Sequence, residues 1–434
     1  MPGNPRDAAA AIWRAALAAG DVAPLLRHHL RLDGTCLTSG SLTLDLDRVR
    51  RVLVLGAGKA GASMARAVES ILRGRVGEGF VVVKDGYRLP AARIEIAEAG
   101  HPVPEARGLA ASARLLALAE SATAEDLLIF LVSGGGSALT PAPAPPVTLE
   151  EKQAVTQLLL AGGATINELN AVRKHLSRFK GGLLARAASP ATILTLALSD
   201  VIGDPLDVIA SGPTAPDSTS YAEALAVLER RGVTDRTPRS VLERLRAGAG
   251  GEIPETPKRG DPVFERVTNL VIGNNALVVD AAAAEAARLG YRPHVLTRSL
   301  QGEARDVARE LLARARAMPG PACLIAGGET TVTVRGSGRG GRCQEFGLAA
   351  ALQLEEGEDL VVLAAGTDGT DGPTDAAGGI VDGGTVARAR TAGLDAARAL
   401  ADNDAHAVLT AVGDSVVTGP TNTNLLDLYL IVRP

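Results

Sequence analysis

Residues 51–61 read RVLVLGAGKAG, a short aliphatic run that ends abruptly in glycines. Short apolar runs that alternate with helical segments are typical of parallel strands buried on both faces. We therefore predict an α/β fold whose largely parallel, Rossmann-like sheets are flanked by helices, with ligands at the carboxyl ends of the strands. The same design recurs in LLIFLVSGGGSA (127–138), TILTLALSDVIGD (192–204), NLVIGNNA (269–276), CLIAGGETT (323–331) and LVVLAAGTDGTDG (360–372).

The length of the chain, 434 residues with 46% apolar residues, predicts two domains. Residues 247–262 (AGAGGEIPETPKRGDP) are rich in glycine, proline and charge and predict the linker. The domains would then span residues 1–246 and 263–434. Capping boxes at Thr148 and Ser220 predict the starts of two helices, and Asp7 is the expected N-cap of the first helix.

Composition excludes several classes of partner. The formal net charge is −4, so the chain carries no basic footprint for nucleic acid. Aromatic residues make up only 2% of the chain, too few for stacking on single strands. The sequence contains no uninterrupted apolar stretch of membrane-spanning length. Its three cysteines are widely spaced, which indicates a reducing, cytoplasmic location.

The loop at 56–61 matches G-x-G-x-x-G through Gly56, Gly58 and Gly61. Such a loop before a helix binds phosphate groups through backbone amides. Asp85, after the next apolar run, could serve as the ribose-binding acid of a dinucleotide fold. Lys59 is unusual for that fold but suits phosphoryl transfer, where negative charge develops on the moving group. An exposed lysine on a structural turn is the alternative.

The segment 133–137 places three consecutive glycines at the end of an apolar run. Such a stretch loses much backbone entropy on folding, which favours a ligand packed against the backbone. The spacing does not fit a Walker A loop. We predict that this segment binds phosphate through Ser133, Gly134, Gly135, Gly136 and Ser137.

A second glycine-rich segment, GSGRGGRCQE (336–345), leads into an apolar helix. Arg342 lies at the junction, where a guanidinium could clamp a phosphate or carboxylate in bidentate fashion. The flanking glycines suggest free space around it. The alternative is that Arg342 pairs with Glu345 on the first helical turn.

Acidic residues gather at two predicted strand ends. Asp368, Asp371 and Asp375 lie in GTDGTDGPTD, and Asp200 and Asp204 lie in SDVIGD. Mg²⁺ binds through one or two carboxylates together with substrate phosphates. We predict Asp368, Asp371 and Asp200 as metal ligands, with turn capping as the alternative role.

Two histidines and a basic cluster accompany these segments. His101 and His175 are each expected to be structural, because a lone histidine rarely carries catalysis. Arg173, Lys174 and Lys180 form a local basic cluster. It could be a solvated helix face, or it could close over an anionic substrate.

Taken in order, these segments resemble the type 2 glycerate kinase family, with its N-terminal kinase-associated domain and C-terminal MOFRL domain. The resemblance implies phosphorylation of D-glycerate by ATP and Mg²⁺, usually at the 2-hydroxyl, in a cleft between the domains. It also implies that Lys59 and Arg342 are the key active-site cations. A homodimer is a possible oligomeric state. The matching stretches are VLVLGAGKAG, GHPVPEARG, LVSGGGSAL, GATINELNAVRKHLSRFKGG, SDVIGDPLDVIASGPTAPD, GGETTVTVRGSGRGGRCQEF, GTDGTDGPTDAAGGIVD and DSVVTGPTNTNLLDL.

The sequence departs from the family pattern at three positions. Cys343 replaces a usual asparagine, and a thiol cannot reproduce the hydrogen bonds of an amide. Ile202 replaces a common proline, and Asn422 replaces a small residue or histidine. Because relatives have also been called hydroxypyruvate reductases, an NAD(P)H-dependent reductase is the alternative function.

Overall fold

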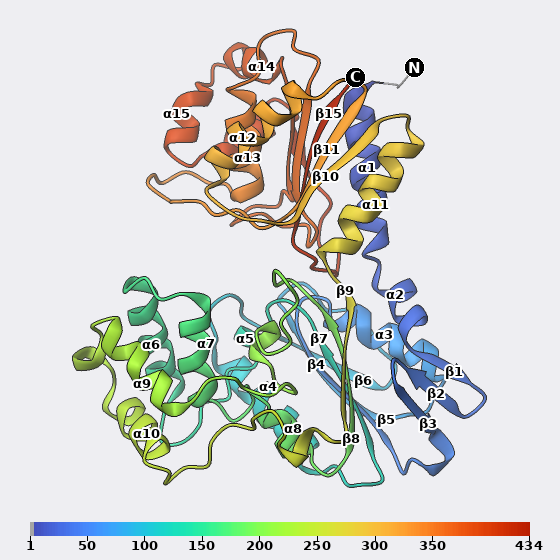
Figure 1. Cartoon of the computed structure of the whole chain (residues 1–434), viewed down its shortest axis with the longest axis vertical. Coiled ribbons are helices and arrows are strands. Elements are labelled where there is room, and N and C mark those ends of the chain that lie inside the picture. The colour runs from blue at the N-terminus through green and yellow to red at the C-terminus, as the bar shows by residue number, and fades with distance from the viewer. Residues whose placement is uncertain (1–3) are drawn as a thin grey trace. The chain divides into compact units, whose positions relative to one another are not determined.

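A computed structural model describes residues 4–434, which form two compact units. The central unit is Val22–Ile272, and the terminal unit combines the N-terminal residues up to Asp21 with Gly273–Pro434. Figure 1 shows that each unit is built around its own sheet.

The central unit is organised around a six-stranded sheet of order β6-β5-β4-β7-β8-β9. The pairs from β6 through to β8 are all parallel, as predicted. Every residue of β4 and of β7 is buried, which explains their uninterrupted apolar sequences. The strands are β4 (Val52–Ala57), β5 (Val76–Lys84), β6 (Ile94–Ala99), β7 (Leu127–Val132), β8 (Thr192–Leu198) and β9 (Val267–Gly273).

The direction in which strands are added to this sheet reverses between β4 and β7. The strands after β4 in sequence, β5 and β6, extend the sheet to one side, whereas β7 and β8 extend it to the other. At such a switch point the loops after the two strands diverge and leave a crevice where ligands bind. The two glycine-rich segments 56–61 and 133–137 follow β4 and β7, so they meet at this point.

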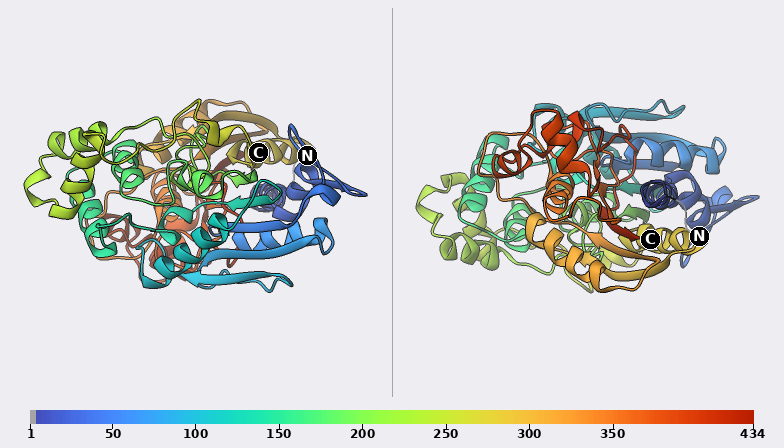
Figure 2. Two further views of the ribbon diagram at one scale, coloured as in Figure 1. Left: turned by 90° about the horizontal axis from the view of Figure 1, so that it is seen from below. Right: turned by 90° about the horizontal axis from the view of Figure 1, so that it is seen from above.

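Helices of the central unit fall into two groups. The first packs on the sheet and comprises α3 (Gly61–Leu72), α4 (Ala106–Glu120), α5 (Gly136–Leu139) and α8 (Leu183–Ala188). The second shares a separate apolar core and lies to one side of the strands (Figure 2). It comprises α6 (Leu149–Ala161), α7 (Ile166–His175), α9 (Tyr221–Arg230) and α10 (Arg239–Ala249). The unit also contains α2 (Val22–His29) and a small antiparallel sheet of β1 (Arg31–Asp33), β2 (Cys36–Ser39) and β3 (Leu42–Asp45).

The terminal unit contains a six-stranded sheet of order β10-β11-β15-β12-β13-β14. Figure 1 shows α1 and α11 on one face of this sheet and α12 and α13 on the other. Its strands are β10 (Arg292–Leu300), β11 (Ala322–Gly328), β12 (Val361–Gly366), β13 (Gly378–Asp382), β14 (Ser415–Val416) and β15 (Asp427–Arg433). Its helices are α1 (Pro5–Ala19), α11 (Asn275–Arg288), α12 (Ala304–Ala317), α13 (Arg342–Ala351), α14 (Thr385–Thr391), α15 (Ala396–Ala401) and α16 (Ala405–Ala411).

This second sheet is mixed, whereas the sequence predicted a largely parallel one. Only β10 and β11 pair in parallel, and the other four pairings are antiparallel. Residues 367–377 join β12 to β13 without an intervening helix. A connection this short cannot cross over to a parallel neighbour, so the pair is antiparallel.

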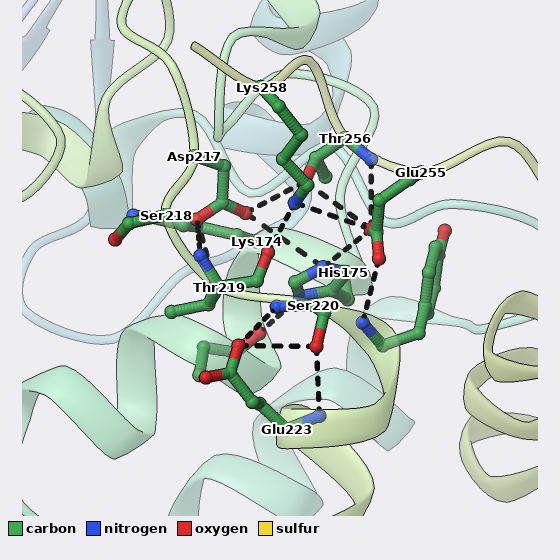
Figure 3. Close-up of polar contacts among 12 residues, drawn as sticks. Lys174, His175, Asp217, Ser218, Thr219, Ser220, Glu223, Glu255, Thr256 and Lys258 are labelled. Atoms are coloured by element: carbon green, nitrogen blue, oxygen red, sulfur yellow. Dashed lines mark hydrogen bonds and ion pairs between the residues drawn. The ribbon is translucent and has the colours of Figure 1, made fainter.

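The boundary between the units also differs from the predicted linker. Residues 247–262 lie inside the central unit, and β9, which follows them, completes its sheet. Figure 3 shows why the segment belongs there: Glu255, Thr256 and Lys258 take part in the polar network around Asp217. Helix α1 belongs to the terminal unit, so the compact units of the structure do not coincide with the predicted domains 1–246 and 263–434.

Helix starts were predicted well where a capping box was present. Thr148 and Ser220 cap α6 and α9 as expected, and Thr165 forms a third box at α7. The first helix begins earlier than expected, because Asn4 and not Asp7 accepts the hydrogen bond of the cap. No single described helix is long and apolar enough to span a membrane, although α1 and α2 pass that test as a bent pair.

Candidate active site

The glycines of 56–61 are required by close packing within the central unit. A side chain at Gly56 would lie 2.7 Å from the carbonyl oxygen of Leu131, and one at Gly61 would lie 2.7 Å from Val81. Gly58 has φ of 139° and faces Ser133, leaving no room for a Cβ atom. The fingerprint spacing thus serves the packing of this segment against β5, β7 and Ser133, whether or not a ligand binds here.

Backbone amides of the 56–61 loop are already hydrogen-bonded. Gly58 donates to Val82 O, Lys59 to Gly134 O and Ala60 to Ser133 Oγ, at 2.9–3.0 Å. By contrast, the amides of Gly134, Gly135 and Ser137 donate to no acceptor within residues 4–434. The amides at the switch point that are available to a ligand are therefore those of Gly134, Gly135 and Ser137.

Lys59 lies beside these amides. A Cβ atom built on Gly135, whose φ is 86°, would be 3.6 Å from Lys59 Cγ and 3.1–3.2 Å from the ring of His101. The lysine, the histidine and the glycine segment consequently line one spot at the carboxyl edge of the sheet. His101, expected to be structural, is thus a member of the candidate site.

The predicted basic cluster divides into two parts. Arg173 and Lys180 both donate to Ser137 Oγ, so they extend the site around the 133–137 segment. Lys174 points elsewhere and pairs with Asp217 at 3.2 Å (Figure 3). It also pairs with Asp207 at 3.3 Å. Neither of the two expected roles therefore fits the whole cluster.

His175 is structural, as expected. Its ring contacts Ala171 O at 2.6 Å. It also contacts Glu255 Oε1 at 2.9 Å, within the network of Figure 3. The ring is buried and stacks edge-on against Tyr221. This histidine joins α7 to the 255–258 segment.

Asp85 is held by an arginine. Its two carboxylate oxygens accept from Arg107 at 2.7 and 2.8 Å, and this pairing lowers the pKa of Asp85. A carboxylate engaged in this bidentate pair is not presented to a ribose. The geometry thus weakens the dinucleotide interpretation of the 56–61 loop.

In the terminal unit, Arg342 begins α13 and is clamped by two carboxylates. Its Nε and Nη2 donate to Asp427 at 2.5 and 2.9 Å, and its Nη1 lies 2.5 Å from Glu329. Burial alone would lower the pKa of Arg342, but the Asp427 carboxylate overrides this and raises it. Glu345, the alternative partner, pairs instead with Arg305.

Asp427 was missed by the sequence analysis. It opens the apolar strand β15, is fully buried, and also accepts a hydrogen bond of 3.0 Å from the Tyr429 hydroxyl. The sequence feature that could have identified Asp427 is its position as an acidic residue at the start of an otherwise apolar strand. Only the three-dimensional fold could identify Arg342, 85 positions earlier, as its partner.

The glycines near Arg342 are used for packing and do not clear space for a ligand. A side chain at Gly336 would collide with Asp402, one at Gly338 with Asp404, and one at Gly341 with Asp371. The expectation of open space around Arg342 is therefore not supported by these glycines.

The predicted metal ligands do not come together as one set. Asp371 is buried, and its carboxylate accepts the amides of Cys343 and Gln344 at 3.1 and 2.8 Å, so it caps α13. Burial raises the pKa of Asp371 to about 6, against the opposing effect of these hydrogen bonds. Asp368 lies beside Gly366 near Asp427, whereas Asp200 follows β8 in the other unit. The described residues contain no group of three acidic, histidine or cysteine ligands around one point.

Cys343, at the position where the resemblance leads one to expect asparagine, lies in the core of the terminal unit. Burial raises the pKa of its thiol well above the usual value, and the neighbouring Asp427 and Asp371 add to that shift. Cys323 is buried as well, and its pKa is raised to about 12. Only Cys36 is exposed among the three cysteines.

We therefore expect a single thiol of the native protein to react with Ellman's reagent. The thiolate is the reactive form, and burial suppresses it at the two core cysteines. Titration in buffer and then in guanidinium should give one and three thiols per chain. Rapid native reaction of a second thiol would contradict the burial of Cys343 and Cys323.

The chain is similar in sequence to known protein families. Residues 8–246 match the model of a domain of unknown function, DUF4147, and residues 322–427 match the MOFRL family. A D-glycerate 2-kinase from Thermotoga maritima is 44% identical across 89% of this chain and 91% of its own. A putative hydroxypyruvate reductase from Agrobacterium vitis is 43% identical across 88% and 87%.

A solved structure gives the same result for the fold. The crystal structure of a glycerate kinase from Thermotoga maritima matches with a TM-score of 0.84 and 39% identity, covering 99% of both chains. Matches of this extent in sequence and in fold show common descent over the whole chain. The chain therefore belongs to the glycerate kinase family and is a kinase.

Proposed function

We propose that this protein phosphorylates D-glycerate at the 2-hydroxyl, using ATP and Mg²⁺. The proposal rests on one observation: Lys59 lies, at the switch point of the sheet, beside backbone amides that donate no hydrogen bond within the described residues. These are the amides of Gly134, Gly135 and Ser137. Phosphoryl transfer requires positioned cations and hydrogen-bond donors more than covalent chemistry from the protein. The names of the relatives supply the acceptor, D-glycerate.

In this proposal Lys59 and Arg342 have different roles. The amides of the 133–137 segment bind phosphate oxygens, and Lys59 neutralises charge on the transferred group. Arg342 is held in one orientation by Asp427, so its guanidinium meets an anionic substrate group without reorganisation. Glu329 also forms an ion pair with Arg342 at 2.5 Å.

The residues present fit a magnesium ion that is carried mainly by the phosphates. Asp368 is the candidate protein ligand, because it lies on the loop that follows β12; one of its carboxylate oxygens also accepts the Thr370 amide at 3.0 Å. A single carboxylate suffices, since Mg²⁺ retains water and binds phosphate oxygens. When bound, the ion would neutralise charge on the phosphate chain.

The direct test is to incubate the protein with ATP, Mg²⁺ and D-glycerate and to identify the product by phosphorus NMR. We expect 2-phosphoglycerate, no product when EDTA removes the metal, and no oxidation of NADH or NADPH with hydroxypyruvate. Steady NAD(P)H oxidation at a rate matching any kinase activity would favour the reductase instead.

Replacing Asp368 by asparagine is expected to raise the Mg²⁺ concentration needed for half-maximal activity. Loss of even an outer partner of a metal ligand costs ~10–100-fold in metal affinity, so loss of the ligand should cost at least as much. Asp371→Asn is the matched comparison on the same loop and should leave this concentration unchanged. If both variants needed the same Mg²⁺ concentration for half-maximal activity, Asp368 would be excluded as a metal ligand.

A further inference from the structure

The helical group of the central unit contains a pocket of about 380 Å³ that the glycine-rich loops do not account for. One face of α6 lines it, through Lys152, Thr156 and Leu160, and one face of α7 lines it, through Ile166 and Arg173. With Leu169, which also lines the pocket from α7, the residues of each set are three or four apart, which places each set along one side of its helix. The volume lies in the usual range for small-molecule sites.

Three cations gather on one side of this pocket. Lys180 donates to Ser137 O and Oγ at 2.7 and 2.9 Å, and Arg173 donates to the same hydroxyl. Lys152 donates to two carbonyl oxygens, Pro141 O and Leu176 O, at 2.8 and 3.1 Å. Within the part of the chain that the structure describes, no carboxylate pairs with any of the three.

The two lysines of this cluster are buried without a carboxylate counter-ion, which is energetically unfavourable. Lys180 and Lys152 are only 1% and 6% exposed. Burial lowers the pKa of both lysines, and the charge of Arg173 lowers each further. Buried charges without a counter-ion destabilise a fold, so such a cluster is typical of a site that receives an anion.

The mouth of the pocket is apolar. Six large apolar side chains are exposed in the described chain, and Val103, Leu160 and Ile166, at 55–60% exposure, all line this pocket. Exposed apolar residues gathered in one place indicate a binding surface. A ligand for this pocket therefore combines several negative charges with an apolar body.

We propose that this pocket binds the nucleotide donor, with the base between the apolar side chains of the mouth and the phosphates at the cations. The assignment rests on the proposed kinase function. D-glycerate carries one carboxylate and would leave most of the volume empty, whereas the phosphate chain of ATP matches three cations. Ser137 joins the two regions, because its hydroxyl contacts the cations and its amide belongs to the segment beside Lys59.

The first experiment places a fluorescent reporter at the mouth of the pocket. The chain has one tryptophan, Trp13, which is buried in helix α1 of the other unit. Leu160→Trp adds a second at an exposed position, so folding is not at risk. Adenylyl imidodiphosphate with Mg²⁺ should change its fluorescence saturably, and D-glycerate alone should not; the native protein is the control. A silent reporter, or a response to D-glycerate alone, would overturn the assignment.

The second experiment removes a cation. Lys180→Met should weaken nucleotide binding roughly 10- to 100-fold, the usual effect of losing a hydrogen bond to a charged group. The KM for D-glycerate should stay unchanged, and the melting temperature should stay equal or rise, because an unpaired buried charge disappears. Arg239→Met, an exposed cation on α10, is the matched control and should alter neither constant.

An increase in the KM for D-glycerate with unchanged nucleotide affinity would overturn the proposal and make the pocket an acceptor site. These experiments test the pocket assignment and the proposed reaction independently. A responding Leu160→Trp protein that does not phosphorylate D-glycerate would contradict the reaction and keep the pocket. Full kinase activity of a Leu160→Trp protein whose fluorescence does not respond to the nucleotide would support the reaction and contradict the pocket assignment.

Discussion

Lys59→Ala is expected to lower kcat by roughly 10²–10³-fold, the usual effect of removing a preorganised donor to a transition state. The lysine follows β4 at the switch point, and its aliphatic chain lies over Gly135. Its charge meets the phosphoryl group only as negative charge develops there, so the loss should appear in kcat more than in KM.

The measurement is steady-state kinetics with ATP and D-glycerate, together with thermal unfolding of the same samples. Lys84→Ala is the matched control, because Lys84 ends β5 at the same edge of the sheet. We expect the control to retain activity and both variants to melt near the native temperature. Near-native turnover of Lys59→Ala would exclude a direct role for this lysine.

Elements with strong local signals were predictable from the sequence. The buried runs of β4 and β7 contain nothing but apolar residues and glycine, and only a strand covered on both faces accommodates such a composition. Capping boxes at Thr148 and Ser220 were equally informative, because the helix start depends on residues three apart.

Features that depend on distant contacts were not predictable. The 247–262 segment has the composition of a linker, yet Glu255 and Thr256 are bound to His175 and Asp217 of the central unit. The direction of β15 likewise depends on its pairing with β11 and β12, about which its own residues carry no information.

The candidate site shows the same division. The glycine-rich strand ends predicted that Lys59 and the 133–137 segment lie at one edge of the sheet, and the structure places both there. The glycines themselves were ambiguous, because Gly56 and Gly61 serve packing and a single sequence does not separate packing from ligand approach. Arg173 and Lys180 could be separated from Lys174 only by the direction in which each side chain points.

Arg342→Ala is expected to destabilise the protein as well as to inactivate it. Removing the guanidinium leaves the Asp427 carboxylate buried, 1% exposed, without its bidentate partner. Breaking a buried ion pair from one side costs about 3–5 kcal/mol, because a charge remains where water is excluded. The position of Arg342 after a glycine-rich loop gave no sign of this partner.

Urea unfolding measures the effect, since the midpoint falls with the free energy of unfolding. Arg107→Ala is the control, because it also breaks a bidentate arginine–carboxylate pair, with Asp85, but at a surface where both side chains are half-exposed. Exposed pairs contribute little, so we expect only a small shift there. A similarly small shift for Arg342→Ala would mean that water reaches Asp427.

A double variant separates stability from chemistry. In Arg342→Met with Asp427→Asn, both buried charges are gone, and replacing a buried pair by neutral groups is often close to neutral for stability. We therefore expect the unfolding midpoint to recover towards the native value while activity stays low, because no guanidinium is present to meet the substrate anion. Recovery of activity along with stability would show that Arg342 serves only to neutralise Asp427, and the catalytic cations would then reduce to those around the 133–137 segment.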